Sequence, residues 1–299
     1  MKRPSRKALF ILLPAVLLIG LITAIFSKKA VESTYYASNL PHPLVIAHQG
    51  GDGVWPGNTL YAFQHAAAMG VDVIETDLRQ SSDGVLVISH DESVDGKSNG
   101  VGRVTDLTYA QLKKLDAAYN WSPEEGPTFP YRGKGIKYVS LEEVFKALPN
   151  MRFNIDMKQI DPPIYSELCE LIRNYKMQDK VVAASFSHQN TVAFRKICPE
   201  VTTAGDETET RIFVFMNFAY LGRWFSPDFK TFQVPINSSG ITIITPHFVR
   251  AAYARNLRVD VWTIDETSEM KRLLEMGVDG IITDRPDRLM ELLQRMPSD

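Results

Sequence analysis

Residues 71–91, VDVIETDLRQSSDGVLVISHD, combine two apolar segments with a histidine and several acidic residues. The first segment, 71–77, is rich in β-branched residues and ends at Glu75 and Asp77, so we expect a buried strand. Side chains two residues apart leave the same face of a strand, which places these two carboxylates side by side. Carboxylates directed at one point repel each other unless a cation lies between them, and ligands that are all oxygen suit Mg²⁺ or Ca²⁺. The pair therefore predicts a site for one divalent cation.

The second apolar segment, 85–89, follows a Ser-Asp-Gly turn signal at residues 82–84 and leads directly to His90. If the two strands form a hairpin centred on the first two turn residues, His90 lies opposite Glu75. If a short crossover joins two parallel strands instead, His90 still emerges at the C-terminal end of a strand. Both topologies bring an imidazole to the carboxylates. The simpler alternative treats these side chains as ordinary polar residues at strand ends.

Outward from this stretch, apolar strand-like segments alternate with amphipathic helical segments from residue 44 to the C-terminus. This alternation predicts an α/β fold, a parallel (β/α)8 barrel of the TIM type. Residues 92–138, rich in glycine and proline around one expected helix at 108–118, are expected to be a small insertion. Nine segments compete for eight strand positions, so one of them is misassigned or lies outside the barrel. These segments are 44–47, 71–77, 85–89, 153–158, 181–186, 201–204, 231–235, 258–264 and 280–283.

Barrel enzymes of this type carry their reactive residues at the C-terminal ends of the strands. The polar residues at these ends are His48, Glu75, Asp77, His90, Asp156, Lys158 and Thr283. Asp156 and Lys158 again share one strand face. A third carboxylate together with a lysine suits a metal ion that holds a phosphate.

The N-terminal sequence predicts a membrane anchor. Residues 8–26, ALFILLPAVLLIGLITAIF, form an uncharged apolar run that is long enough to span a bilayer. Four basic residues precede the run and two follow it, which favours a cytoplasmic N-terminus and an extracytoplasmic catalytic domain. No small-x-small cleavage site precedes Lys28, so we expect residues 1–29 to be a retained single-pass signal anchor, with a cleaved signal peptide as the alternative. Residues 30–43 are then a polar linker, and residues 44–299 are the barrel domain.

Charge and cysteine content limit the function classes. Without the six basic residues around the apolar run, the 33 lysines and arginines fall to 27, against 35 acidic residues. This balance is a poor electrostatic match for nucleic acid, and no protein partner is predicted. Cys169 and Cys198 could pair outside the cytosol, but two buried thiols are the simpler interpretation.

Eight short motifs follow one another in a specific order along the chain. They are His48-Gln49-Gly50, Pro56-Gly57-Asn58-Thr59, Glu75-Thr76-Asp77, Asp83-Gly84, His90-Asp91, Asp156-Met157-Lys158, Val261-Trp262-Thr263 and Gly280-Ile281-Ile282-Thr283-Asp284. This set, spanning about residues 44–293, resembles the glycerophosphodiester phosphodiesterase family. The resemblance implies a β/α barrel that cleaves a glycerol-phospho-alcohol to glycerol 3-phosphate and the alcohol.

The resemblance also implies roles for individual residues. The divalent metal, Mg²⁺ or Ca²⁺, is expected on Glu75, Asp77 and Asp156, the last standing where glutamate is commoner. A general acid/base pair is expected at His48 and His90, and the sequence does not assign the acid and the base. Substrate contacts are expected from Lys158, Gln49, Asn58 and Trp262, although a tryptophan in the core is an equally good interpretation of Trp262.

Two positions depart from the family pattern. Gln49 stands where the family usually has arginine, which removes a guanidinium that could pair with phosphate. Gly57 replaces a glutamate in the usual Pro-Glu-Asn-Thr motif, so a carboxylate near the site is missing. An inactive barrel that binds lipid or a partner is therefore kept as an alternative to the hydrolase.

The segment 212–225, IFVFMNFAYLGRWF, is unusually apolar and aromatic for a barrel connection. It is either an outer helix packed on the barrel or an apolar wall near the mouth that accepts an acyl chain or touches a bilayer. With the anchor, the second interpretation makes lysophospholipids candidate substrates and a lysophospholipase D a candidate function, beside hydrolysis of water-soluble glycerophosphodiesters.

Overall fold

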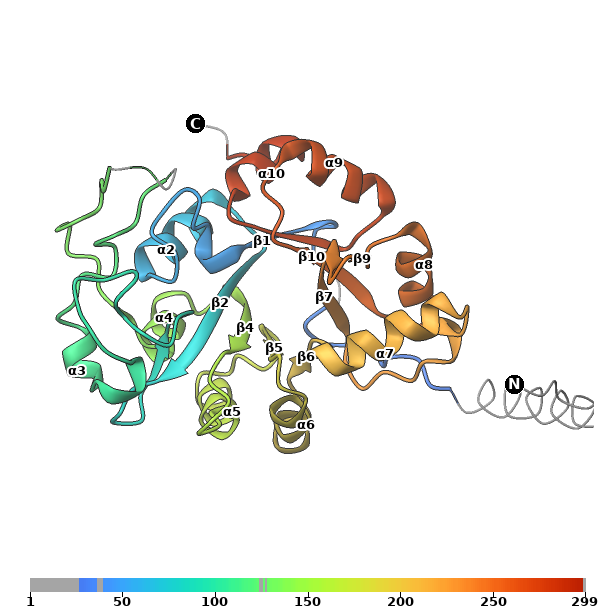
Figure 1. The fold of residues 1–299 in the computed structure, drawn as a ribbon, viewed down its shortest axis with the longest axis horizontal. Helices are drawn as coiled ribbons and strands as arrows, with labels where there is room; N and C mark the ends of the chain where they lie inside the picture. Colours follow the sequence, from blue (N-terminus) through green and yellow to red (C-terminus); the bar gives the residue numbers. More distant parts are fainter. Residues whose placement is uncertain (1–26, 37–39, 124–125, 127, 298–299) are drawn as a thin grey trace, which may run out of the picture.

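Eight parallel strands form the barrel of the computed structural model, which describes residues 27–36, 40–123, 126 and 128–297. Their order is β6-β5-β4-β2-β1-β11-β10-β7, and a parallel bridge between Ala204 and Thr231 joins the two end strands. The TIM-type barrel is thus confirmed (Figure 1). The strands are β1 (Leu44–Ala47), β2 (Val73–Gln80), β4 (Arg152–Met157), β5 (Val181–Ala184), β6 (Thr202–Thr203), β7 (Thr231–Pro235), β10 (Arg258–Trp262) and β11 (Gly280–Thr283).

Most of the predicted membrane anchor, residues 1–29, falls on residues 1–26, which lie outside the described part of the chain. Within the described ranges, no helix combines the length and the apolar character needed to cross a bilayer.

The ninth strand candidate lies outside the barrel as the partner of a hairpin. β3 (Leu86–Ile88) pairs antiparallel with β2, and Leu78 is opposite Ile88. The hairpin alternative is therefore confirmed and the parallel crossover is wrong. The observed register centres the turn on Asp83. His90 is therefore offset by one residue from the position directly opposite Glu75. His90 follows β3 at the end that lies beside the C-terminal half of β2.

Local capping marks the ends of several helices. Thr59 accepts a hydrogen bond from the Ala62 amide at the start of α2, and Gly70 ends this helix with a left-handed φ of 87°. Ser140 and Glu143 form a capping box at the start of α4. The helices around the barrel are α2 (Leu60–Met69), α4 (Leu141–Ala147), α5 (Tyr165–Asn174), α6 (His188–Ile197), α7 (Glu207–Phe218), α8 (Pro246–Ala254), α9 (Thr267–Met276) and α10 (Pro286–Leu292).

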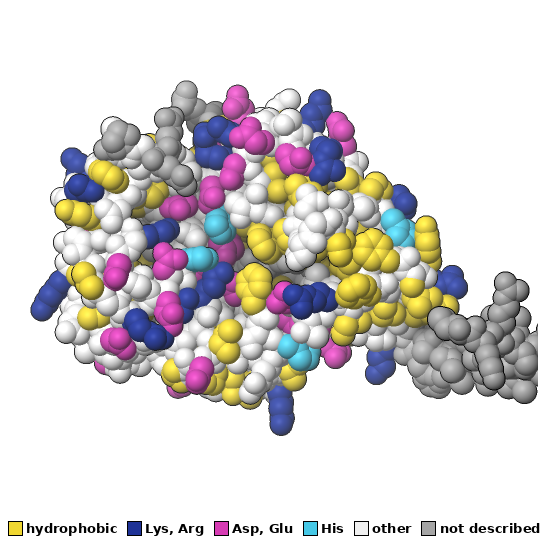
Figure 2. All heavy atoms as spheres, viewed as in Figure 1, with side chains coloured by type: hydrophobic (Ala, Val, Ile, Leu, Met, Phe, Trp, Pro, Cys, Tyr) yellow, Lys and Arg dark blue, Asp and Glu magenta, His cyan; other side chains and the backbone are white. Residues whose placement is uncertain are grey.

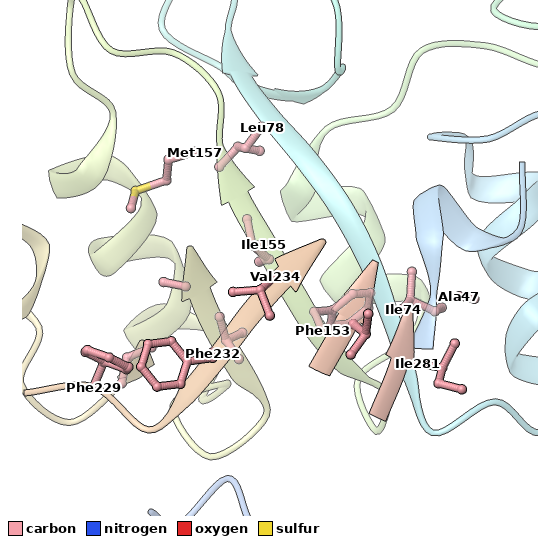
Figure 3. Packing of buried hydrophobic residues seen from close by; sticks show 14 of the residues in the cluster. Ala47, Ile74, Leu78, Phe153, Ile155, Met157, Phe229, Phe232, Val234 and Ile281 are labelled. Atoms are coloured by element: carbon pink, nitrogen blue, oxygen red, sulfur yellow. The ribbon is translucent and has the colours of Figure 1, made fainter. Parts of the chain in front are cut away.

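Alternation along the strands separates two buried layers. Ile74 and Phe153 face outward into the large core between strands and helices, which Figure 3 shows together with Ala47, Ile155 and Ile281. Val73, one residue before Ile74, belongs instead to the small cluster inside the barrel. Because the side-chain period of a strand is two, Glu75 and Asp77 point to the same interior as Val73.

Part of the predicted polar linker, 30–43, is instead a component of the barrel. Tyr35 is only 1% exposed and packs in the interior cluster with Leu44, Ile46 and Val73. The guanidinium of Arg152, at the start of β4, lies 5.9 Å from the Tyr35 ring. The linker interpretation is wrong at this position because an aromatic side chain fills the N-terminal end of the barrel, where the short strand residues leave space.

The segment 92–138 forms a satellite unit after β3 with a small core of its own, which includes Val94, Val104 and Leu112. Its elements are η2 (Val104–Asp106) and α3 (Tyr109–Leu112), so the predicted helix 108–118 is too long. Beyond the end of α3, the Asp116 carboxylate accepts hydrogen bonds from the backbone amides of Ala118 and Gly133. Such local side-chain bonds compete with helical hydrogen bonding.

Cys169 on α5 and Cys198 at the end of α6 form a disulfide, with an S–S distance of 2.12 Å. The simpler interpretation, two buried thiols, is therefore wrong. The two helices are neighbours around the barrel, and their packing brings the two sulfurs together.

Candidate active site

The predicted metal ligands lie at the C-terminal ends of two adjacent strands. In the parallel pairing of β2 with β4, Asp77 is opposite Asp156 and Glu75 is opposite Asn154. All three carboxylates are buried and point into the barrel. Lys158 follows β4 and lies two residues after Asp156, so its side chain points to the same interior. It extends over the carboxylates.

Lys158 links two of these carboxylates. Its Nζ lies 2.8 Å from Asp156 Oδ2 and 3.2 Å from Asp77 Oδ1. Burial lowers the pKa of the ammonium, but Asp156 and Asp77 outweigh this effect and raise its pKa above the ordinary value. Lys158 is therefore a permanent positive charge at the mouth of the acidic cluster.

The carboxylates carry more negative charge than Lys158 alone balances. Burial, followed by the neighbouring charge of Asp77, raises the pKa of Glu75 to about 8. Burial likewise raises the pKa of Asp156. Asp77 Oδ1 and Asp156 Oδ1 are buried oxygens without a hydrogen-bond partner, because the Lys158 contact with Asp77 is close in distance but not aligned as a hydrogen bond.

These oxygens fit a hard divalent cation in chemistry and placement, since buried carboxylates that lack donors are the ligands such an ion prefers. In this structure the ligand oxygens of Glu75, Asp77 and Asp156 do not all lie within 4.8 Å of one another. Among the described residues, two other sets have ligand atoms within 4.8 Å of one another, Cys169 with Cys198 and Glu200, and His188 with Asp206 and Glu209. The first set contains the disulfide, and in the second Asp206 caps α7 while Glu209 binds Arg195.

His48 follows β1 and is held by an acidic partner that the sequence analysis did not assign. Its Nδ1 lies 2.7 Å from Asp284 Oδ1, and its Nε2 lies 3.8 Å from Glu75 Oε2. Burial lowers the pKa of this imidazole, but Glu75 and Asp284 outweigh burial and raise the pKa to about 9. Strand pairing explains the contact: Ala47 is opposite Thr283 in β1 and β11, so the next residue of each strand is a neighbour of the other.

His90 reaches the same site from the hairpin. Its Nδ1 lies 2.8 Å from Asp91 Oδ1, and its carbonyl oxygen accepts hydrogen bonds from the Arg79 guanidinium at 3.0 and 3.1 Å. The imidazole is more exposed than that of His48 and lines the same cavity. The structure thus brings the two predicted histidines to one cavity together with Glu75 and Asp156.

Gln49 and Asn58 donate hydrogen bonds to two of the predicted metal ligands in this structure. The backbone N–H of Gln49 donates to Glu75 Oε2 at 3.0 Å, whereas the side-chain oxygen of Gln49 accepts from Lys97. Asn58 Nδ2 donates to Asp77 Oδ2 at 2.9 Å, and Asn58 Oδ1 accepts from Thr76. Direct contact of these two side chains with substrate stays a prediction.

Two charged side chains that the sequence did not identify, Asp52 and Lys97, lie beside Gln49 and Gly57. Lys97, from the insertion, donates to Gln49 Oε1 at 2.9 Å and lies 3.4 Å from Asp52 Oδ2. Asp52 Oδ1 accepts from the Gly57 amide, and a Cβ placed on Gly57 would lie 2.4 Å from that oxygen. The Asp52 carboxylate therefore occupies the space that a side chain at position 57 would need, and Lys97 places a positive charge next to Gln49. Because 48 residues separate Lys97 from Gln49, no local signal reveals that contact.

The cavity over these groups has a volume of about 440 Å³ and two chemically different sides. One side carries the histidines, carboxylates and Lys158, and Figure 2 shows charged and histidine side chains around this central hollow. The other side combines apolar side chains, including Phe186, Trp262 and Ile243, with charged ones such as Glu207 and Arg211. Trp262 thus lines the cavity, with its ring 6.2 Å from that of Phe186.

Comparison with known proteins identifies the family of this chain. The pattern of the glycerophosphoryl diester phosphodiesterase family matches residues 48–288, so the chain belongs to that family and is a phosphoric diester hydrolase. It is 32% identical over 257 residues to a glycerophosphodiester phosphodiesterase of Caldanaerobacter subterraneus subsp. tengcongensis, a match that covers 84% of this chain and 98% of the relative.

Two further relatives differ in their named activity or ligand. A lysophospholipase D of Rattus norvegicus is 27% identical over 277 residues, covering 84% of this chain and 86% of that protein. An Oleispira antarctica phosphodiesterase, solved in complex with the product sn-glycerol-3-phosphate, has a TM-score of 0.68 at 22% identity, covering 88% and 100% of the two chains. At that identity the structural likeness shows the fold.

Proposed function

We propose that this chain hydrolyses glycerophosphodiesters to glycerol 3-phosphate and an alcohol with one bound divalent cation and two catalytic histidines. The observation that carries the proposal is the meeting of His48 and His90 in one cavity with buried carboxylates and Lys158. The cavity is large enough for a small phosphodiester, and its positive groups suit the phosphate.

Glu75, Asp77 and Asp156 are the residues that would hold Mg²⁺ or Ca²⁺. When bound, the cation neutralises charge on the phosphodiester oxygens and so lowers the barrier to attack by a nucleophile. Lys158 supplies a second positive charge to the same phosphate from the rim of the cluster. The hydrogen bonds from Gln49 and Asn58 keep Glu75 and Asp77 oriented for this purpose.

The histidines perform the proton transfers. The glycerol hydroxyl next to the ester attacks phosphorus within the same molecule, which gains from proximity. One imidazole removes the proton of that hydroxyl, and the other protonates the oxygen of the departing alcohol. Water then opens the cyclic phosphate with the proton transfers reversed, which leaves glycerol 3-phosphate.

The test compares His48→Ala, His90→Ala and the control His65→Ala for release of glycerol 3-phosphate from glycerophosphocholine. His65 lies on α2, where its Nδ1 is 2.8 Å from the Tyr61 carbonyl oxygen. Loss of one acid or base is expected to reduce kcat by roughly 10²-fold or more. The control is expected to retain activity. Equal activity of all three variants would contradict the assigned roles.

A second candidate, hydrolysis of lysophospholipids, is favoured by the apolar side of the cavity. Phe186 is 53% exposed there, although an aromatic ring of this size gains by burial. An acyl chain laid along Phe186, Trp262 and Ile243 would cover these side chains. The lysophospholipase D activity named for one relative is consistent with this use of the site. Phe186→Ser is expected to raise KM for lysophosphatidylcholine and to leave KM for glycerophosphocholine nearly unchanged.

The location we propose is a single-pass anchor with a cytoplasmic N-terminus and an extracytoplasmic barrel. The flanking charges of residues 8–26 support this orientation. The Cys169–Cys198 disulfide supports an oxidising compartment for the barrel. Protease added to intact cells is expected to degrade the barrel, and protection of the barrel until the membrane is opened would contradict this orientation.

A further inference from the structure

α7 and the turn that follows it expose a continuous apolar surface. Phe215 is 64% exposed, Phe218 is 57% exposed and Tyr220 is 77% exposed. Ile212 and Leu221 extend the same surface, which we call the α7 face. Hydrophobic side chains gather over this part of the molecule in Figure 2. Large apolar surfaces of this kind on a folded domain mark sites of protein or membrane contact.

The α7 face is separate from the side of the helix that packs on the barrel. Ile212, Phe215 and Phe218 are three residues apart and so follow one side of the helix. Phe213 and Asn217 lie on the other side and are buried. The buried side of α7 therefore packs on the barrel core, whereas the outer apolar side chains stay largely exposed, and the Tyr220 ring lies 5.0 Å from that of His247.

The position of Lys28 identifies what covers the α7 face. The Lys28 amide donates to Ser226 Oγ at 3.1 Å, and the Arg255 guanidinium donates to the Lys28 carbonyl oxygen. Arg255 also donates to the carbonyl oxygen of Arg223 in η3 (Gly222–Trp224), directly after the α7 face. The apolar run 8–26 ends two residues before Lys28. A bilayer spanned by that run therefore begins next to η3 and the end of α7.

The start of α7 connects this face to the catalytic cavity. Glu207, Thr210 and Arg211 line the cavity, and Ile212 begins the α7 face at the next position. Ile243 lines the cavity beside them, just after the small hairpin of β8 (Asn237–Ser238) and β9 (Ile241–Thr242). Arg211, which pairs with Glu207, and Arg223 lie at the two ends of this segment, where they would meet anionic headgroups.

We propose that the α7 face rests on the surface of the lipid bilayer, so that the mouth of the catalytic cavity opens at the headgroup layer. The inference rests on the proposed membrane anchor, and its readout is independent of catalysis. Phe215, Phe218 and Tyr220 enter the boundary between headgroups and acyl chains, which removes their apolar area from water. Substrates released from or embedded in that layer then reach the histidines without crossing bulk solvent.

The test places one fluorescent label at a time on the full chain. Phe215→Cys and Tyr220→Cys are labelled with an environment-sensitive fluorophore, and Val101→Cys is the matched control. Val101 is 81% exposed in the insertion, which Figure 1 places across the barrel from α7. All three positions are exposed, so labelling does not disturb the core, and the native cysteines are joined to each other.

The labelled proteins are reconstituted into vesicles of phosphatidylcholine and phosphatidylglycerol, with and without brominated acyl chains. Blue-shifted emission and quenching by bromine at positions 215 and 220, but not at 101, are the expected results. Emission at 215 and 220 that matches position 101 in both vesicles would overturn the proposal. A blue shift at position 215 that bromine does not quench and that grows with protein concentration would also overturn the proposal. That result would assign the α7 face to contact with a second copy of the chain. If labels are quenched but phosphodiesters are not cleaved, the docking surface stands and the proposed reaction fails.

Discussion

The carboxylate of Asp284, together with that of Glu75, raises the pKa of His48. Asp284 Oδ1 is 2.7 Å from Nδ1, which leaves Nε2 directed toward Glu75 and the cavity. The carboxylate is itself fixed in the chain, because the Asp284 amide donates to Asp265 Oδ1 at 2.8 Å. A buried imidazole with a raised pKa can hold a proton at neutral pH and deliver it at Nε2, which suits protonation of a leaving alcohol.

Replacing Asp284 with asparagine is expected to lower the pKa of His48 from about 9, because a negative charge that favours the imidazolium is lost. The limb of the pH–activity profile that reports His48 should move to lower pH, and kcat should fall by roughly 10²-fold. The matched control is Asp287→Asn, whose carboxylate pairs with Arg285 on α10 outside the site. An unchanged pH profile in the Asp284 variant would contradict this positioning role.

The sequence predicts residues whose geometry depends on one element and misses those that depend on closure of the barrel. Glu75 and Asp77 share a face because of the two-residue period of one strand, and this holds in any sheet. The His48–Asp284 contact exists only because β1 pairs with β11, a neighbourhood that joins the two ends of the domain. Lys97 likewise reaches Gln49 only through the fold, because 48 residues separate the two.

Among the elements, the hairpin of β2 and β3 has the most direct functional consequence. It returns the chain to the site and delivers His90 without using a barrel position. The turn signal at 82–84 predicted this element, whereas its register differed by one residue because the turn is centred on Asp83. Asp83 Oδ1 accepts from the Ser81 hydroxyl at 2.7 Å and from the Tyr109 amide at 2.8 Å, which ties the hairpin to the insertion.

The disulfide between α5 and α6 is expected to stabilise the barrel by restricting its unfolded state. Its two cysteines are separated by 29 residues, a loop for which the chain-entropy estimate is about 3.6 kcal/mol. The double variant Cys169→Ser, Cys198→Ser should therefore unfold at lower urea concentration than the oxidised wild type. Reductant should lower the wild-type midpoint toward that of the variant and leave the variant unchanged. A wild-type midpoint that is indifferent to reductant would contradict the disulfide.

On the scale of the whole molecule, the two ends of the barrel have separate tasks. Catalytic groups occupy the C-terminal end of the strands, as the fold predicts. Tyr35 closes the interior from the other end, against Leu44, Ile46 and Val73. The fold class was predictable because strand and helix periods alternate through the domain. The closing role of Tyr35 was not, since a single aromatic residue in a polar segment gives no periodic signal.

Tyr35→Ala is expected to destabilise the folded chain by about 3 kcal/mol or more, because a large buried side chain is removed from a closed space. The exposed residue Tyr220 provides the control, and Tyr220→Ala should change stability by no more than about 0.5 kcal/mol. Urea unfolding of both variants in one detergent solution measures the two changes in the free energy of unfolding. Equal stability of the two variants would show that residues 27–36 contribute nothing to the barrel.

The most direct measurement follows glycerol 3-phosphate released from glycerophosphocholine by the full chain after chelation and the return of Mg²⁺ or Ca²⁺. Release that ceases on chelation, resumes with one of these ions and is abolished in Asp77→Asn is the predicted result. Undiminished release from the stripped protein, or wild-type release from Asp77→Asn, would contradict a reaction that depends on a cation held by these carboxylates.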